Sequence, residues 1–141
     1  MLSTEKKDLD ILHMINRYIM QHFKNYNFKV DNGLKETAFL ILDNGSSVLG
    51  PLSAAQINLG TPFVPDLLDF NHKKIIEYEE EAKPNHGPKI VKRGHFEESN
   101  RDTRRDHYYH LAGFSLLKIW ENEFKNNTWK DKIDAFLGHV N

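Results

Sequence analysis

The 141-residue chain contains no cysteine, and this absence excludes a disulfide framework, a Cys-based zinc site and a catalytic thiol. It also has no run that approaches the roughly 20 apolar residues of a membrane span, so we expect no membrane partner. Residues 1–7 lack the apolar core of a signal peptide. We therefore expect a cytoplasmic protein. One domain over residues 1–141 fits the usual size of about 100–200 residues.

Charge of one sign is not in excess either, because 19 Lys and Arg stand against 20 Asp and Glu. Composition alone therefore gives no indication of nucleic-acid binding. The distribution is uneven, however. Acids gather in Glu77–Glu81, and the basic residues that follow are Lys83, Lys89, Lys92, Arg93, Arg101, Arg104 and Arg105. Such a pair of clusters is typical of a metal centre beside a phosphate-binding surface, but a solvated surface of mixed charge explains the clusters equally well.

Hydrophobic periodicity predicts a helix near the N-terminus, with an apolar stripe at intervals of three and four residues formed by Leu9, Leu12, Ile15, Ile19 and Phe23. The apolar run Thr37–Leu42 is a strand or a buried helix, and Asp43–Gly45 then marks a turn, consistent with a hairpin. Glycine and proline indicate that Ser46–Pro62 is mainly loop, with a short strand or one helical turn at Ala54–Leu59.

Two strands are predicted next, Phe63–Phe70 and Lys74–Ala82, which form an antiparallel hairpin if the short connection between them is tight. A helix capped at Ser99 or Asn100 is expected to end at Gly113, before a strand over Phe114–Trp120. The last helix has a predicted core face of Trp129, Ile133, Phe136, Leu137 and Val140. This order predicts an α/β fold with a mixed central β-sheet flanked by helices.

Alternation along the second strand places Glu77, Glu79, Glu81 and Lys83 on one face. Carboxylates that share a site repel one another and raise one another's pKa. A bound Mg²⁺ removes this conflict, since it prefers oxygen ligands and keeps several waters. The alternative is the solvent-facing side of an exposed strand, which is what an acidic strand end usually is.

The motif Pro65-Asp66, ten residues, then Glu77-x-Glu79 resembles the signature of the PD-(D/E)XK nuclease superfamily. The very-short-patch-repair endonuclease branch, with related homing and phage endonucleases, is the most similar. That similarity rests on Ile75-Ile76-Glu77-Tyr78-Glu79, His95, Asp102-x-x-Arg105 and Ala112-Gly113-Phe114-Ser115-Leu116-Leu117-Lys118-Ile119-Trp120-Glu121. The resemblance covers Pro62 to Leu137 and leaves the first 60 residues without an assigned role.

The resemblance implies a restriction-endonuclease-like fold and a DNA endonuclease that depends on Mg²⁺ or Mn²⁺. Asp66, Glu77 and Glu79 would be the metal ligands. His95 would be the general base or would orient the attacking water, since an imidazole titrates near neutrality. Lys83 would steady the scissile phosphate.

Contacts to the DNA backbone would come from the basic tract, through Lys92, Arg93, Arg101, Arg104 and Arg105. Helix-surface salt bridges are an equally good explanation for the three arginines. The resemblance nevertheless implies that DNA is the partner. A homodimer that cuts both strands and a monomer that nicks one strand are both compatible with the sequence.

Two departures from the family pattern leave alternatives open. Glu79 stands where the superfamily usually has Lys, although the repair-endonuclease branch also has an acid there. Glu81-x-Lys83 is a competing reading of the motif, but the apolar residues before Glu77 favour Glu77 and Glu79. Glu36 is a candidate for an additional acid from the N-terminal part, against the simpler interpretation of an ordinary surface residue.

The main alternative function is a non-catalytic nucleic-acid-binding module on a degenerate nuclease fold, which the loss of the usual Lys favours. A metal-dependent enzyme acting on a small phosphate ester is a third hypothesis, against which the basic helix argues.

Overall fold

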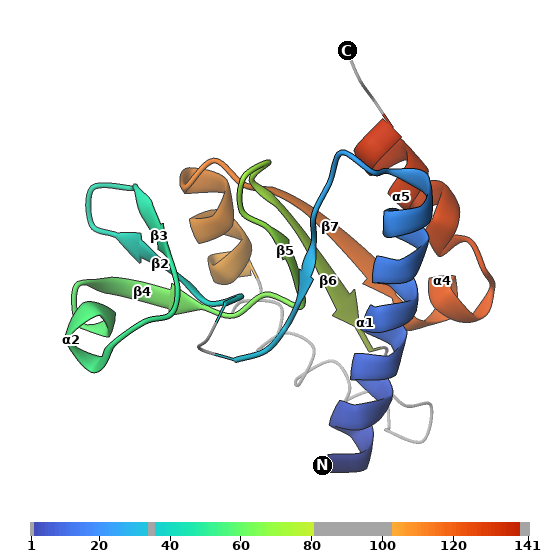
Figure 1. Ribbon diagram of the computed structural model, residues 1–141, viewed down its shortest axis with the longest axis horizontal. Coiled ribbons are helices and arrows are strands. Elements are labelled where there is room, and N and C mark those ends of the chain that lie inside the picture. Colours follow the sequence, from blue (N-terminus) through green and yellow to red (C-terminus); the bar gives the residue numbers. More distant parts are fainter. Residues whose placement is uncertain (1, 34–35, 81–102, 139–141) are drawn as a thin grey trace, which may run out of the picture.

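The computed structural model of the protein describes residues 2–33, 36–80 and 103–138, with side chains from Asp8 onward (Figure 1). The elements are α1 (Leu2–His22), β1 (Lys29–Val30), β2 (Phe39–Leu42), β3 (Ser47–Leu49), α2 (Ala54–Ile57), β4 (Gly60–Phe63), β5 (Leu67–Asp69), β6 (Lys74–Glu79), β7 (Ser115–Trp120), α4 (Glu121–Lys125) and α5 (Trp129–Gly138). Residues 103–111 are also helical and are called the crossover helix below, because they lie between β6 and β7 in the chain.

The larger sheet has four strands in the order β1-β5-β6-β7. β5 and β6 form the predicted antiparallel hairpin, with Leu67 opposite Ile76 and Asp69 opposite Lys74. β6 and β7 run parallel, and a parallel pair requires a crossover connection such as the one that contains the crossover helix. The predicted mixed sheet flanked by helices is thus confirmed at the level of the α/β class.

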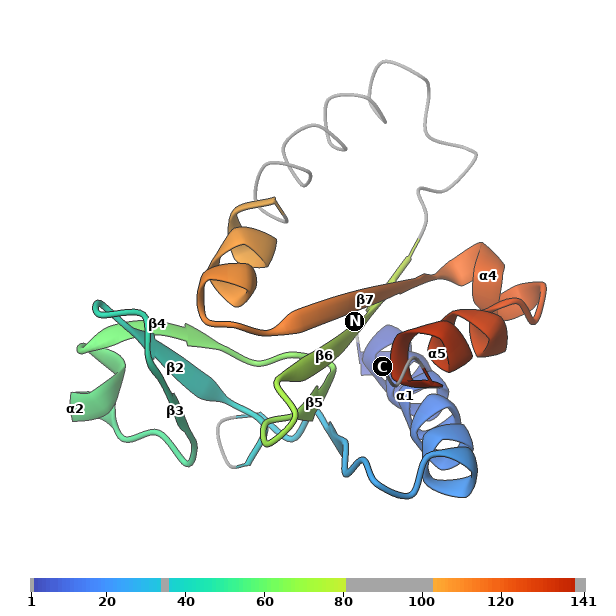
Figure 2. The same ribbon diagram turned by 90° about the horizontal axis from the view of Figure 1, so that it is seen from above.

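One face of this sheet is covered by α1 and α5 (Figure 2). Ile76 and Ile119 of the sheet pack there against Ile15 of α1 and against Trp129 and Ile133 of α5, and all five are almost fully buried. Leu12, Ile15 and Ile19 of the stripe expected in the first helix are buried as predicted, and Phe23 packs beside them just after α1 ends. Leu9 is exposed, so the stripe is shorter at its N-terminal end than expected. Most of the core face expected in the last helix is confirmed; Val140 lies outside the described residues.

The opposite face of the sheet packs against β2 and the crossover helix. Ile75 of β6 joins Phe39 of β2 and Tyr109 of the crossover helix in a second core, together with Phe114. The crossover helix stops where the sequence predicts, because Gly113 adopts a left-handed backbone with φ of +87°, a conformation common just after helix ends. The start of this helix lies outside the described residues.

A smaller sheet has the order β3-β2-β4 and carries the short helix α2 (Figure 1). It corrects two predictions. Phe63–Phe70 is two strands in different sheets, separated by residues 64–66. In Ser46–Pro62 the helical turn expected within Ala54–Leu59 is confirmed as α2, but the residues on either side form β3 and β4 where mainly loop was expected. β4 tolerates Pro62 because it is an edge strand, where a missing N–H breaks no ladder bond. Gly60 is required there, since a Cβ would collide with the backbone of Ile41.

Within the described residues, no helix combines the length and the hydropathy that crossing a bilayer requires.

Candidate functional site

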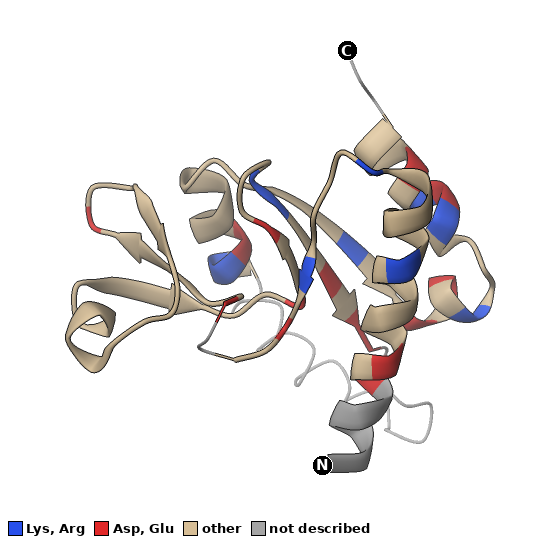
Figure 3. Ribbon diagram, viewed as in Figure 1, with Lys and Arg blue, Asp and Glu red and all other residues tan. Residues whose placement is uncertain are grey.

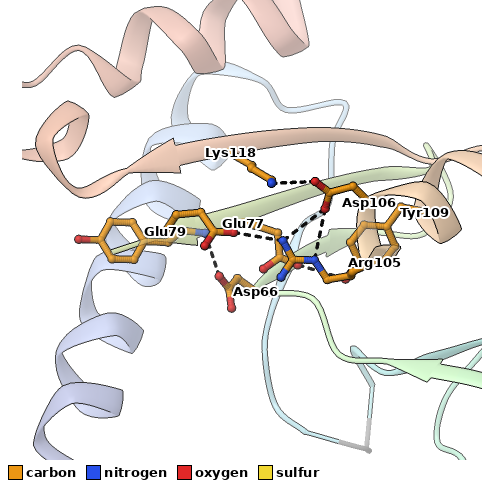
Figure 4. A network of polar contacts seen from close by, with 8 residues as sticks. Asp66, Glu77, Glu79, Arg105, Asp106, Tyr109 and Lys118 are labelled. Carbon is orange, nitrogen blue, oxygen red and sulfur yellow. Dashed lines mark hydrogen bonds and ion pairs between the residues drawn. The ribbon is translucent and has the colours of Figure 1, made fainter. Parts of the chain in front are cut away.

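The three predicted metal ligands lie together on the face of the larger sheet that meets the crossover helix (Figure 4). Asp66 immediately precedes β5, and Glu77 and Glu79 alternate along β6. The backbone N–H of Tyr78 donates to Asp66 Oδ2 at 2.8 Å, and the carbonyl of Asp66 accepts from the N–H of Asp31 at 2.8 Å. The main chain of two neighbouring strands therefore fixes Asp66 beside β6.

Alternation along β6 matches the prediction as far as the strand is described. Ile76 and Tyr78 face α1 and α5, whereas Glu77 and Glu79 face the crossover helix. Glu80 is exposed, as its position requires.

Glu77 is buried and Asp66 is half-buried, and their carboxyl groups form a pair. Only 5% of Glu77 is exposed, and its side chain is within hydrogen-bond reach of the Asp66 carboxyl. Burial, and then the charge of Asp66, raise the pKa of Glu77 well above its usual range. Burial also raises the pKa of Asp66, against the opposing effect of the Tyr78 N–H. Two buried carboxyls in contact share a proton or take up a cation, because two adjacent buried charges are strongly unfavourable.

Tyr109 and Arg105 approach this pair from the crossover helix. The hydroxyl of Tyr109 donates to Glu77 Oε2 at 3.2 Å, and Arg105 Nη2 donates to Glu79 Oε2 at 3.1 Å. Burial works to lower the pKa of Arg105, but Glu77, Tyr109 and Glu79 together raise it, so the guanidinium stays charged. Arg105 is thus turned toward the carboxylates, and only a quarter of its side chain is exposed.

Asp106 and Lys118 extend the network toward β7. Asp106 Oδ1 accepts from Arg105 Nη2 at 3.3 Å, while Asp106 Oδ2 lies 2.7 Å from Lys118 Nζ. Lys118 is the register partner of Glu77 on the adjacent parallel strand, so both side chains emerge from the same face of the sheet. Neither Asp106 nor Lys118 was assigned a functional role from the sequence, since the contact between them joins two different elements of the fold.

A further acid, Asp8 of α1, comes close to the end of β6 and was not expected there. Burial, and then the charge of Glu80, raise the pKa of Asp8 to about 6, with smaller contributions from Asp66 and Glu121. Figure 3 shows this gathering of acidic segments on α1, β6 and α4. A signal was present in the sequence, because Asp8 continues the apolar stripe of Leu12 at helical spacing and so points toward the sheet.

Glu36, the acid considered for such an additional role, instead accepts a hydrogen bond from Asn32 Nδ2 at 2.9 Å within its own turn and is exposed. This contact supports the simpler interpretation of Glu36 as a surface residue.

The other predicted site residues divide into two groups. Arg104 is exposed on the crossover helix, as contact with a phosphate backbone requires, in contrast to Arg105. The remaining predicted site residues lie outside the described residues: Lys83, Lys92, Arg93, His95 and Arg101. Glu81 lies outside them too, so the competing reading of the motif, Glu81 with Lys83, has no described structure.

The carboxyl pair offers oxygen ligands for a divalent cation. Among the described side chains, no three acids or histidines are grouped so as to hold a metal ion. Mg²⁺ nevertheless needs few protein ligands, since it is usually bound by one or two carboxylates together with waters and substrate phosphates. Asp66 and Glu77 supply the required oxygen donors. Burial raises the pKa of both groups, and the charge of Asp66 raises that of Glu77 further, a repulsion that a cation relieves.

Comparison with protein-family models, with curated proteins and with solved structures finds no match to this chain. The function is therefore argued from the chemistry of the site.

Proposed function

We propose that this protein is a metal-dependent DNA endonuclease built on a restriction-endonuclease-like fold. The observation that carries the proposal is the carboxyl pair of half-buried Asp66 and buried Glu77, held beside Glu79 by the β5–β6 hairpin. Burying carboxyls is costly unless they are paired or bind a cation. Such a group on the packed face of a sheet is more readily explained by chemistry than by stability.

Asp66 and Glu77 would hold Mg²⁺ or Mn²⁺, which when bound polarises a phosphoryl oxygen and lowers the pKa of a water. The chain's own contribution is positional. The Tyr78 N–H fixes Asp66, and the Tyr109 hydroxyl fixes Glu77. Any proton held by the carboxyl pair would leave when the pair takes up the cation.

In the proposed reaction the water oxygen bonds to phosphorus and the P–O3′ bond breaks. The water proton passes to a base, for which His95 is the candidate. The O3′ takes up a proton from solvent water, so that 5′-phosphate and 3′-hydroxyl ends result. Arg104 and the basic tract that precedes it would contact the DNA backbone. A homodimer, a nicking monomer and a cytoplasmic location are all compatible with this proposal.

A second candidate function is a non-catalytic nucleic-acid-binding module. The observation that favours it is Arg105, which already balances the charge of Glu79 without a metal. In that case the carboxyl network would serve only to dock the crossover helix on the sheet.

The test is cleavage of supercoiled plasmid by the purified protein in Mg²⁺ or Mn²⁺, with EDTA and Asp66→Ala as negative controls. Asp43→Ala is the matched control, because Asp43 is an exposed acid in a turn of the smaller sheet. We expect nicked or linear product with the wild type and with Asp43→Ala, and none with EDTA or Asp66→Ala. DNA binding without cleavage, undiminished by Asp66→Ala, would favour the binding module instead.

A further inference from the structure

Lys118 is a cation placed next to the carboxyl pair, on the strand that neighbours Glu77. The parallel register sets Lys118 directly beside Glu77, and Lys132 Nζ donates to the Lys118 carbonyl at 2.6 Å, which fixes the main chain at this point. The Lys118 side chain emerges on the carboxylate side of the sheet, where its ammonium group meets Asp106 (Figure 4).

The two cations of the network are held very differently. Arg105 is bound by Glu79 and Asp106, and it lies over the Tyr109 ring. In the described part of the chain, the side-chain nitrogen of Lys118 has one partner, Asp106, whose other oxygen already serves Arg105. Both members of the Lys118–Asp106 pair are about a quarter exposed, with 25% and 28% of their side chains accessible. The Arg105 side chain is equally exposed, so the difference between the two cations is the number of partners. An ion pair that solvent reaches is weak, and Lys118 has a single one to give up, so Lys118 is the cation that can change partners.

Phosphodiester hydrolysis needs such a cation. The attacked phosphate gains negative charge on its non-bridging oxygens in the transition state, and a positive group held where that charge develops stabilises it more than the ground state. A lysine is suited to this, as a compact point charge on a flexible stem.

We infer that Lys118 is a catalytic residue that leaves Asp106 to neutralise the developing charge on the scissile phosphate. The inference rests on the proposed nuclease function and deepens it. Asp106 is then a positioning residue, which keeps the ammonium group next to the site while DNA is absent. The role assigned from the sequence to Lys83 falls instead to a strand residue whose position the sheet fixes.

The experiment measures plasmid cleavage rates and, separately, affinity for a short duplex in EDTA. We expect Lys118→Ala to lower kcat by about 10²–10³-fold, the usual loss when one donor to a developing charge is removed. Affinity in EDTA should change by no more than about threefold, because the contact is made chiefly in the transition state. Lys125→Ala is the matched control, since 71% of its side chain is exposed and its partner lies on its own helix.

A purely structural role of Lys118, docking the crossover helix through Asp106, predicts a different pattern. Asp106→Asn would then reduce cleavage and melting temperature as much as Lys118→Ala. The inference instead predicts that Asp106→Asn retains most of kcat.

The absence of cysteine permits a chemical rescue. Lys118→Cys would carry the chain's one thiol, and 2-bromoethylamine converts it into an amine of nearly lysine length. Restored cleavage after aminoethylation, with none after iodoacetamide, is the expected result.

Several outcomes would overturn the inference. Lys118→Ala cleaving within about twofold of wild type, while Asp66→Ala is inactive, would remove the role of Lys118 and leave the proposed function intact. The same holds if Lys83→Ala abolishes cleavage and Lys118→Ala does not. A wild type that never cleaves would overturn both proposals.

Discussion

The two faces of β6 bury neighbouring residues of opposite chemistry. Toward α1 and α5, Ile76 is fully buried among aliphatic and aromatic side chains. Toward the crossover helix, Glu77 is almost as deeply buried, yet it bonds to Asp66 and Tyr109 and interacts with the charge of Arg105. Apolar burial of an isoleucine stabilises the fold, whereas burial of a carboxyl opposes it. On the face of β6 that meets the crossover helix, the buried carboxyl therefore lowers stability while it positions charge.

The largest expected effects come from two separate substitutions, one at Ile76 and one at Glu77. Ile76→Ala should lower the free energy of unfolding by about 2–5 kcal/mol, since it leaves a cavity in the apolar core. Glu77→Gln should leave stability equal to wild type or higher at pH 8, although under the proposed function it abolishes cleavage. The measurements are urea unfolding and plasmid cleavage.

The direction of the stability change in Glu77→Gln follows from the raised pKa of Glu77. The folded state binds the proton more tightly than the unfolded chain, so wild-type stability falls as pH rises through the raised pKa. Glutamine removes that loss. A large drop in stability for Glu77→Gln at pH 8 would contradict the comparison, because it would make Glu77 a stabilising residue like Ile76.

A smaller effect on stability is expected from Tyr109, which contributes both to the apolar core and to the polar network on the face of β6 that meets the crossover helix. Its ring is in the apolar core and its hydroxyl donates to Glu77. Tyr109→Phe should cost about 1 kcal/mol, the net value of one hydrogen bond. Tyr108→Phe is the control, since the Tyr108 hydroxyl makes no hydrogen bond to the described residues. Equal melting temperatures for the two variants would mean that the bond to Glu77 contributes nothing.

The apolar face was predictable from the sequence, and the polar one was predictable only in part. Periodicity is local, so it identified Ile15 and Ile19 on α1 and Ile133 on α5, and alternation placed Glu77 and Glu79 on one side. The strand break at residues 64–66 was missed, although Pro65 is a local signal against a continuous strand. That the chain changes sheets there depends on pairing with β2 and β6, which no local pattern shows.

The residues that pair with the carboxylates could not be predicted from local sequence patterns. The contacts between Arg105 and Glu79, and between Lys118 and Asp106, join residues that are 26 and 12 positions apart. Both depend on the position of the crossover helix over the parallel pair of β6 and β7. Charge spacing along the chain offers a helix-surface salt bridge as the simplest alternative for Arg105. The contact across the sheet requires the three-dimensional fold.

The smallest effect is expected at Asp8, where the apolar stripe of α1 ends in a carboxyl. Its pKa is raised from 3.8 to about 6, by burial and then by Glu80. The folded state therefore holds the proton more tightly, and wild-type stability falls as pH rises from about 4 to about 6. Asp8→Asn should melt with the wild type at pH 4 and above it at pH 7. The difference should be no more than about 2–4 °C, since solvent screens a half-buried group.

Asp10→Asn separates this effect from a general change in helix charge, because Asp10 is exposed on the same helix. Its melting temperature should follow that of the wild type across the same pH range. If Asp8→Asn also follows the wild type, Asp8 is solvated like Asp10. The acidic region would then end at β6, and α1 would contribute only its apolar stripe to the fold.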